Sequence, residues 1–209
     1  MSPQSEAKVA VTSTTSEYSQ EEREVLLRLA HRAIDSALHG VNLDLHPPTA
    51  HLAETRGAFT TLHLHGKLRG CIGYVVPTHS LYRTVAETAQ AAAFDDPRFR
   101  PVTAEEAPEL TIEVSVLSLL QPIRPEDVRV GVHGLVVIYG GRRGLLLPQV
   151  PLQWQWDRET FLAQTCLKAG LPPDAWLQGA ELQAFTAEVF GDDLSSELSG
   201  QTTPTLGLS

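Results

Sequence analysis

The chain has 209 residues and a formal net charge of −9, with 42% hydrophobic and 20% charged residues. This is the composition of a folded globular protein, long enough to bury roughly 70% of the surface that its unfolded chain would expose. The acidic balance excludes a general binder of the phosphate backbone, because that binding depends on Lys and Arg. We therefore expect no nucleic-acid partner.

The cysteine content and the hydropathy pattern indicate in which cellular compartment the protein is expected. Cys71 and Cys166 are the two cysteines of the chain, too few for the disulfide framework of a small secreted domain. The N-terminus lacks the basic start and apolar core of a signal peptide. No apolar run approaches the roughly 20 residues that span a bilayer. The sequence thus favours a cytoplasmic protein with no membrane contact.

Both ends of the sequence are predicted to be disordered. Residues 1–18 and 192–209 are polar, with few large apolar side chains. Such segments cannot offset the entropy lost on ordering. We therefore expect the folded domain at residues 19–191.

Two helices are predicted in the first half of the chain. Ser19 and Glu22 have the spacing of a capping box, and apolar residues recur at helical intervals from there to Gly40. Ser80 can cap a second, alanine-rich helix, which must end within 94–101 because that segment has two prolines. The alanines would let this helix lie close to a sheet.

Two alternating runs, 58–65 and 68–76, flank Gly66 and predict a β-hairpin. A loop with an odd number of residues, most simply 65–67, would place the apolar side chains of both strands on one face: Leu62, Leu64, Leu68 and Ile72. His63, Arg69 and Cys71 would then share the opposite face. A two-residue loop would instead place Cys71 beside the leucines, and the sequence leaves both registers open.

Further elements follow along the chain. Residues 111–117 alternate as a strand, with the isoleucine and two valines toward the core and Thr, Glu and Ser on the other side. A second hairpin is predicted over 130–147 and a third helix after Asp157, with Cys166 in its apolar stripe. A last strand is expected over 182–190. Three tryptophans are expected to close the core or a subdomain junction: Trp154, Trp156 and Trp176.

The segment from Arg69 to Gly73, Arg-Gly-Cys-Ile-Gly, is unusual for a strand interior. Glycine weakens a strand, so two glycines around a cysteine mark a place where another backbone or a ligand comes close. The segment 95–98, Asp-Asp-Pro-Arg, indicates an Asx-type turn braced by Arg98, with a substrate contact by Arg98 as the alternative.

The sequence resembles the AMMECR family, which takes its name from a human chromosomal-region gene associated with Alport syndrome and midface hypoplasia. The resemblance runs from about residue 20 to 191 and depends on six segments in the family's order and spacing: Phe59-Thr60-Thr61-Leu62, Lys67-Leu68-Arg69-Gly70-Cys71-Ile72-Gly73, Ala92-Ala93-Phe94-Asp95-Asp96-Pro97-Arg98-Phe99, Ile112-Glu113-Val114-Ser115-Val116-Leu117, Leu147-Pro148-Gln149-Val150 and Lys168-Ala169-Gly170-Leu171. One departure is Tyr74, where relatives often have a smaller polar residue.

The resemblance implies an α+β fold: an antiparallel sheet packed against helices, a smaller second subdomain, and a cleft beside the Arg69-Gly70-Cys71 strand. It implies no reaction, because the family's activity is not established and a fold does not assign one. Bacterial and archaeal members are often encoded beside a Memo-type protein and a radical-SAM-type protein. Those two proteins are therefore the partners that the resemblance implies.

The strand faces opposite the predicted core define a candidate site. The proposed catalytic residues are Cys71 as a thiol nucleophile and His63 or Glu113 as its base. Residues proposed to contact a substrate are Arg69, Gly70, Gly73, Arg98, Ser115 and Glu188. Arg69 would be the electrostatic anchor. We predict no cofactor and no metal.

Each of these assignments has a plainer alternative. Cys71 can be a small buried hydrophobe, the commonest fate of a free cysteine. Glu113 can simply pair with Arg69 or Arg98, since a carboxylate among apolar neighbours needs a partner. His63 and His65 would form a metal pair with Cys71 if both stayed on the strand.

Two hypotheses on function follow. The first is a cytosolic, cysteine-dependent enzyme or accessory enzyme subunit acting on a small anionic or peptide-linked substrate. The second is a non-catalytic adaptor that binds a partner protein, with Cys71 structural. An enzyme predicts an accessible thiol, whereas an adaptor predicts a buried Cys71 and an exposed apolar patch.

Overall fold

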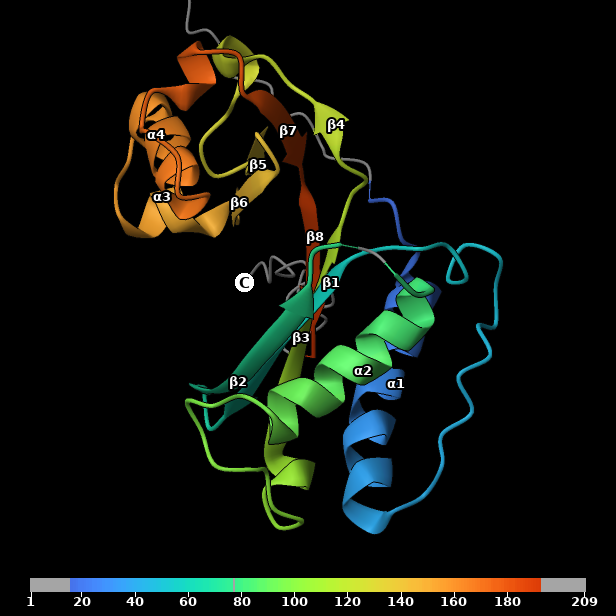
Figure 1. Ribbon diagram of the computed structural model, residues 1–209. Coiled ribbons are helices and arrows are strands. Elements are labelled where there is room, and N and C mark those ends of the chain that lie inside the picture. Colours follow the sequence, from blue (N-terminus) through green and yellow to red (C-terminus); the bar gives the residue numbers. More distant parts are fainter. Residues whose placement is uncertain (1–15, 77, 193–209) are drawn as a thin grey trace, which may run out of the picture.

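The computed structural model describes residues 16–76 and 78–192. The chain forms two four-stranded antiparallel sheets, of which the first is covered on one face by two long helices (Figure 1). Of the predicted tails, 1–18 and 192–209, residues 1–15 and 193–209 lie outside the described residues. Tyr18, which the sequence placed in a tail, is only 2% exposed and belongs to the core of the first sheet.

The first sheet has the strand order β2-β1-β3-β8. Its strands are β1 (Ala58–Leu64), β2 (Lys67–Tyr74), β3 (Leu110–Leu117) and β8 (Ala187–Gly191). Helices α1 (Gln20–His39) and α2 (Leu81–Phe94) cover one face. The alternation predicted for β3 is confirmed: the isoleucine and two valines are buried under the helices, and Thr, Glu and Ser point to the other face.

The helix boundaries follow the predicted capping chemistry. The capping box of Ser19 and Glu22 is formed in both directions at the start of α1, and Gly40 ends this helix with a φ of 66°. The side chain of Ser80 accepts a hydrogen bond from the Arg83 N–H at the start of α2. Local side-chain to backbone bonds therefore decide where both helices begin.

The hairpin between β1 and β2 differs from the expected register. Its loop has two residues, His65 and Gly66, both with positive φ. A β-bulge leaves Arg69 as an extra residue, and beyond it Cys71 lies opposite Thr61. The three-residue loop predicted from sequence is wrong, but the bulge shifts the register by one residue and still places Cys71 on the face away from Leu62. Leu68, predicted to be in the core, lies opposite His63 and is 44% exposed.

The second sheet has the order β4-β7-β5-β6. It comprises β4 (Gln121–Pro122), β5 (Gly134–Tyr139), β6 (Arg142–Leu146) and β7 (Glu181–Phe185), and α3 (Gln149–Gln153) and α4 (Arg158–Lys168) accompany it. Three short 3-10 turns complete the described elements: Ala107–Glu109, Pro125–Asp127 and Ala175–Leu177. Cys166 of α4 is fully buried in the core of this sheet, as predicted.

One extended segment links the two sheets. The single strand predicted over 182–190 is two strands, β7 in the second sheet and β8 in the first, which break at Thr186. The Thr186 N–H donates to Ser118 Oγ at 3.0 Å, on the segment that joins β3 to β4. An apolar cluster of Leu117, Val136 and Phe185 fills the junction between the sheets. Two connections and this cluster thus hold the sheets together.

Two other expectations need correction. Trp156 and Trp176 are partly buried against the core of the second sheet. Trp154 is 67% exposed, so the expectation that it closes the core or the subdomain junction is wrong. The second hairpin begins at Gly134 rather than near residue 130, because the N–H groups of Val132 and His133 both bond to the Arg129 carbonyl in a turn.

Gly70 allows the helix and the sheet to touch. A Cβ at this position would overlap the Ala92 carbonyl oxygen of α2, which is backbone and cannot rotate away. We expect Gly70→Ala to lower the free energy of unfolding by about 2 to 3 kcal/mol through overpacking. Gly66→Ala is the control: the site is open but has a φ of 73°, so a loss of about 1 kcal/mol is expected. Urea unfolding measures both, and an equal loss at the two sites would contradict the steric argument.

Candidate functional site

The face of the first sheet away from the helices gathers polar side chains from adjacent strands. Cys71, Thr61 and Glu113 form one row across β2, β1 and β3, since Thr61 pairs with both of the others. His63 and Ser115 lie on the same face: His63 is two residues after Thr61 on β1, and Ser115 is two residues after Glu113 on β3. Cross-strand neighbours are about 5 Å apart and diagonal ones about 7 to 8 Å. His63 is thus a diagonal neighbour of Cys71, whereas Glu113 lies two strands from the thiol, about 10 Å away, with Thr61 between them.

Two hydrogen bonds fix the backbone of Cys71, whereas its side chain is partly exposed. β2 is an edge strand. The Cys71 N–H donates to Asp96 Oδ2 at 2.9 Å, and its carbonyl accepts a hydrogen bond from Arg98 Nη2 at 3.3 Å. These two side chains satisfy the backbone groups that an edge strand leaves free. The thiol is partly exposed, and Thr61 Oγ1 donates to Sγ at 3.3 Å.

The carboxylate of Asp96 is a charged group buried against the edge of β2. Its side chain is 2% exposed, and it accepts hydrogen bonds from Arg98 Nη2 at 2.7 Å and Nε at 2.9 Å. These bonds, together with that from the Cys71 N–H, hold the pKa of Asp96 well below its ordinary range although burial opposes ionisation. The predicted Asx-type turn is present, because Asp96 Oδ1 also accepts the Arg98 N–H at 3.1 Å.

Arg69 pairs with a carboxylate outside the row. Its Nε and Nη2 donate to Glu106 at 3.2 and 2.9 Å, and Nη2 also donates to the Pro101 carbonyl at 3.2 Å. These bonds lower the pKa of Glu106. Neither Arg69 nor Arg98 pairs with Glu113, so the pairing considered from sequence is not formed.

Three other predicted residues have their own local partners. Glu188 lies opposite Val116 and therefore on the helix-covered side, where it binds Arg23 of α1 at 2.8 Å, so the expectation that it shares the face of Cys71 is wrong. The strand expected over 182–190 breaks at Thr186, and only its second half, β8, belongs to the first sheet. Gly70 makes room for α2, and Gly73 makes room for the Phe59 ring. The close approach that the glycines indicated is made here by protein atoms.

Glu113, His63 and Ser115 are free in the part of the chain that the structure describes. None of their side chains has a hydrogen bond or ion pair there. His65 stands in the turn, 3.4 Å from Glu109, and does not share a strand face with His63. A free carboxylate and a free imidazole beside a partly exposed thiol form an arrangement that can exchange a proton with a ligand.

Sequence reasoning missed two residues that position the thiol. Thr61 lies on a strand, where a threonine is commonplace, so only its pairing with Cys71 shows its role. Asp96 was assigned to a local turn, and its bond to the Cys71 N–H links residues 25 positions apart. Neither contact has a signal in the sequence, because the first depends on the register of β1 and β2 and the second on how α2 returns the chain to β2.

The fold and this face define a class: an α+β protein with two antiparallel sheets and a cysteine-centred polar row on the sheet face away from the helices. The AMMECR1 family model matches residues 27–190, and the chain belongs to that family. It is 45% identical over 185 residues to Protein TK0174 from Thermococcus kodakarensis, covering 81% of this chain and 90% of that one. Protein PF1979 from Pyrococcus furiosus is 44% identical over 185 residues, with 81% and 88% covered.

A solved structure has the same fold. The crystal structure of the uncharacterized protein PH0010 from Pyrococcus horikoshii matches with a TM-score of 0.69 and 44% identity, covering 81% of this chain and 91% of that chain. The names of these relatives state no activity. Within the described ranges, no helix is long and apolar enough to cross a membrane.

The Asp96 contacts predict a pH effect on stability. Because the folded state lowers this pKa from its ordinary value of about 3.9, the stabilisation is complete above that pH and is lost as the pH falls below it. We expect Asp96→Asn to lower the free energy of unfolding by about 2 to 3 kcal/mol at pH 7. Between pH 5 and 3, stability should fall less steeply in the variant than in the wild type.

The matched control is the exposed neighbour, Asp95→Asn. It should change stability by less than about 0.5 kcal/mol and keep the wild-type pH slope. Denaturant unfolding at pH 7, 5 and 3 measures all three proteins. An Asp96→Asn protein with the wild-type slope would show that this carboxylate does not contribute in the way proposed.

Proposed function

We propose that this protein is a cytoplasmic cysteine-dependent enzyme, or an accessory subunit of one, in which Cys71 supplies the reactive thiol. The observation that supports this most strongly is the row formed by Cys71, Thr61 and Glu113, together with the free His63. A purely structural cysteine would be buried, as Cys166 is. Cys71 is instead partly exposed on the sheet face away from the helices, with a hydroxyl donor on its sulfur.

Each group in the row has a chemical role in this proposal. The sulfur of Cys71 is the nucleophile, and Thr61 Oγ1 donates a hydrogen bond to it. His63 or Glu113 takes the thiol proton; attack of the resulting thiolate on a carbonyl carbon then forms the S–C bond while the C=O π electron pair moves to the oxygen, which takes the proton back from the base. The backbone of Cys71 stays fixed between Asp96 and Arg98, so the attacking atom needs no reorganisation of the strand.

The charges around the row bear on the substrate. Arg69 binds Glu106 and its side chain is 13% exposed, whereas Arg98 is 55% exposed beside the Cys71 carbonyl. Arg98 is therefore the better placed guanidinium for a small anionic or peptide-linked substrate. Ser115 supplies a further hydroxyl on the same face. In this assignment Arg69 positions the bulge of β2 and Arg98 contacts the ligand.

Differential alkylation tests the proposal. We expect iodoacetamide to label Cys71 in the folded protein, because its thiol is partly exposed. Thr61→Val should slow labelling at pH 7 about fivefold, the equivalent of ~1 kcal/mol for one hydrogen bond. Mass spectrometry of the two cysteine peptides provides the rates.

The chain contains the controls for this measurement. Cys166 is fully buried, and burial raises the pKa of its thiol, so it should react only on unfolding. Thr111→Val, on the same face but opposite His63, should leave the Cys71 rate unchanged. Labelling of Cys71 only on unfolding, or equal rates in Thr61→Val and wild type, would refute the reactive thiol.

One observation favours an adaptor as the second candidate. Trp154 and Leu152 are 67% and 57% exposed on the second subdomain, and Trp154 stacks on Trp156. Exposed aromatic side chains are the usual anchors of protein interfaces. A Memo-type or radical-SAM-type protein would be the partner, as the family resemblance implies.

The adaptor hypothesis makes a different prediction. Trp154→Ser should change the free energy of unfolding by less than about 0.5 kcal/mol, because the side chain is exposed. It should weaken the binding of a co-expressed Memo-type protein by at least about tenfold. Leu167→Ser, exposed on α4, is the control. Equal binding by both variants and the wild type would exclude Trp154 as an anchor.

A further inference from the structure

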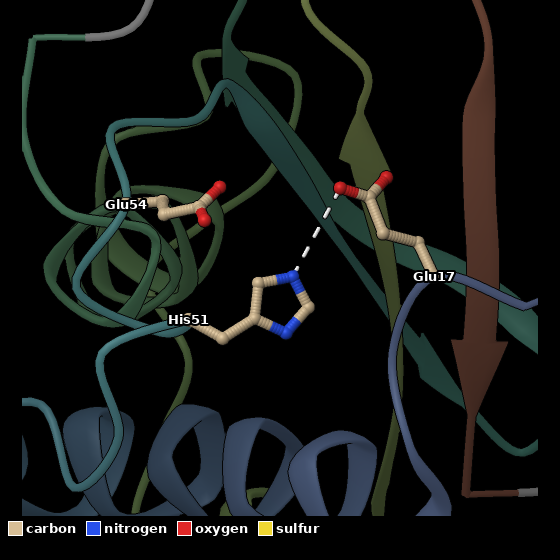
Figure 2. Close-up of side chains that lie close together, drawn as sticks. All are labelled: Glu17, His51 and Glu54. Atoms are coloured by element: carbon tan, nitrogen blue, oxygen red, sulfur yellow. Dashed lines mark ion pairs between the residues drawn. The ribbon is translucent and has the colours of Figure 1, made fainter.

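A second group of ionisable side chains lies on the other side of the first sheet, where the chain enters α1. Glu17 comes from the segment before this helix, and His51 and Glu54 come from the connector between α1 and β1 (Figure 2). One nitrogen or oxygen atom of each residue lies within 4.8 Å of those of the other two. His51 Nε2 is 3.9 Å from Glu17 Oε1, and Figure 2 shows the imidazole directed at this carboxylate.

The imidazole of His51 is held in one orientation. Its other nitrogen, Nδ1, is 3.0 Å from Glu22 Oε1, and the Tyr18 ring stacks on it at 4.6 Å and 6°. Glu22 is itself fixed by the capping box with Ser19. In the tautomer whose Nδ1–H donates to Glu22, Nε2 would be free to bind a metal, which is the arrangement found around metal-binding histidines.

Arg56 forms ion pairs with both Glu17 and Glu54 and offsets part of their negative charge. Its Nη2 lies 2.7 Å from Glu17 and 2.8 Å from Glu54, so one guanidinium nitrogen bridges both side chains. Glu22 adds a further negative charge beside His51. With Arg56 counted, the four charged groups Glu17, Glu22, Glu54 and Arg56 retain an excess of negative charge, so a bound cation would be favoured electrostatically.

A buried hydroxyl at this cluster lacks a partner. Tyr18 is 2% exposed, and its Oη has no hydrogen bond within the described residues. The Tyr18 ring stacks on the His51 imidazole, which places this side chain beside the cluster. An unsatisfied buried hydroxyl costs roughly 1 to 3 kcal/mol. A metal-bound water would provide the missing hydrogen bond.

We propose that Glu17, His51 and Glu54 form a binding site for a divalent transition-metal ion, with Arg56 as the counter-ion that the metal displaces. One imidazole nitrogen and two carboxylates suit Zn²⁺, Mn²⁺ or Co²⁺ better than Ca²⁺ or Mg²⁺, which prefer all-oxygen sites. Bonds of about 2.0 to 2.2 Å place tetrahedral ligands roughly 3.4 Å apart. Rotation of the glutamate side chains is enough to close the present separations.

Metal binding here would tie two segments together. The residues before α1 and the connector before β1 are distant in sequence but contact each other at this site. Glu188 of β8 also accepts the Glu17 N–H at 2.7 Å, which anchors the first of these segments to the sheet. A metal that binds only the folded state would therefore stabilise the entry to the domain in proportion to its concentration. This site is independent of Cys71 and of the proposed thiol chemistry.

Titration of the chelator-treated, desalted full chain with ZnCl₂ in a calorimeter tests the proposal. We expect saturable binding at this site, weakened at least about tenfold in His51→Ala and in Glu54→Gln, since removing a ligand or its charge lowers affinity by such factors. Arg56→Met should bind more tightly than wild type, because it removes the competing cation. A purely structural ion-pair cluster would not respond to Arg56 in this direction.

Two controls isolate the site. His46→Ala removes a solvent-exposed histidine that is paired only with Asp44, and Cys71→Ser removes the other zinc-binding side chain of interest. Both should keep the wild-type zinc affinity. Circular dichroism checks that every variant is folded, and Glu54→Gln, an exposed position, keeps the test valid if His51→Ala does not fold. Absence of binding, or equal affinity in wild type, His51→Ala and Glu54→Gln, would overturn the proposal.

Discussion

Helix α2 and strand β2 meet backbone to backbone at Gly70, and the rest of the first subdomain depends on that contact. The alanine-rich face of α2 and the missing side chain at Gly70 allow this close approach. The chain leaves α2 at Phe94 and reaches Asp96 at once, so the position of the helix decides where this carboxylate lies. Asp96 then bonds to the N–H of Cys71, one residue beyond Gly70. The packing of α2 on β2 therefore also fixes the position of the Cys71 backbone.

The edge of the sheet explains why a charged pair is buried here. β2 has no strand on its outer side, and unpaired backbone groups at an edge invite association with other chains. Asp96 and Arg98 occupy that place beside Cys71, one accepting from its N–H and the other donating to its carbonyl. The bulge at Arg69 adds local twist to the same edge. The same two side chains, Asp96 and Arg98, therefore protect the edge of the sheet and fix the backbone of Cys71.

The two faces of the first sheet have different chemistry. On the helix side, buried apolar residues pack under α1 and α2, and the charged residues at its margin are paired: Glu188 with Arg23, and Glu17 with Arg56. On the other side, Glu113 and His63 have no such partners among the described residues. Ionisable groups left unpaired in a fold that pairs most of its charges are where ligand chemistry is expected. This contrast supports a functional role for the row around Cys71.

The sequence by itself determined the local features: both caps of α1, the cap of α2, the alternation of β3, the buried Cys166 and the family. It also placed Glu113 and Ser115 on one face of β3, because period-two alternation is a local property of a strand. Only the tertiary structure decided the hairpin register, the face of Glu188 and the partners of Arg69 and Arg98. A bulge shifts the alternation of β2 by one residue, and at Thr186 the chain passes from the second sheet to the first; neither has a local signature. The contacts of Asp96 and Tyr18 likewise join segments that only the packing of α1 and α2 on the sheet brings together.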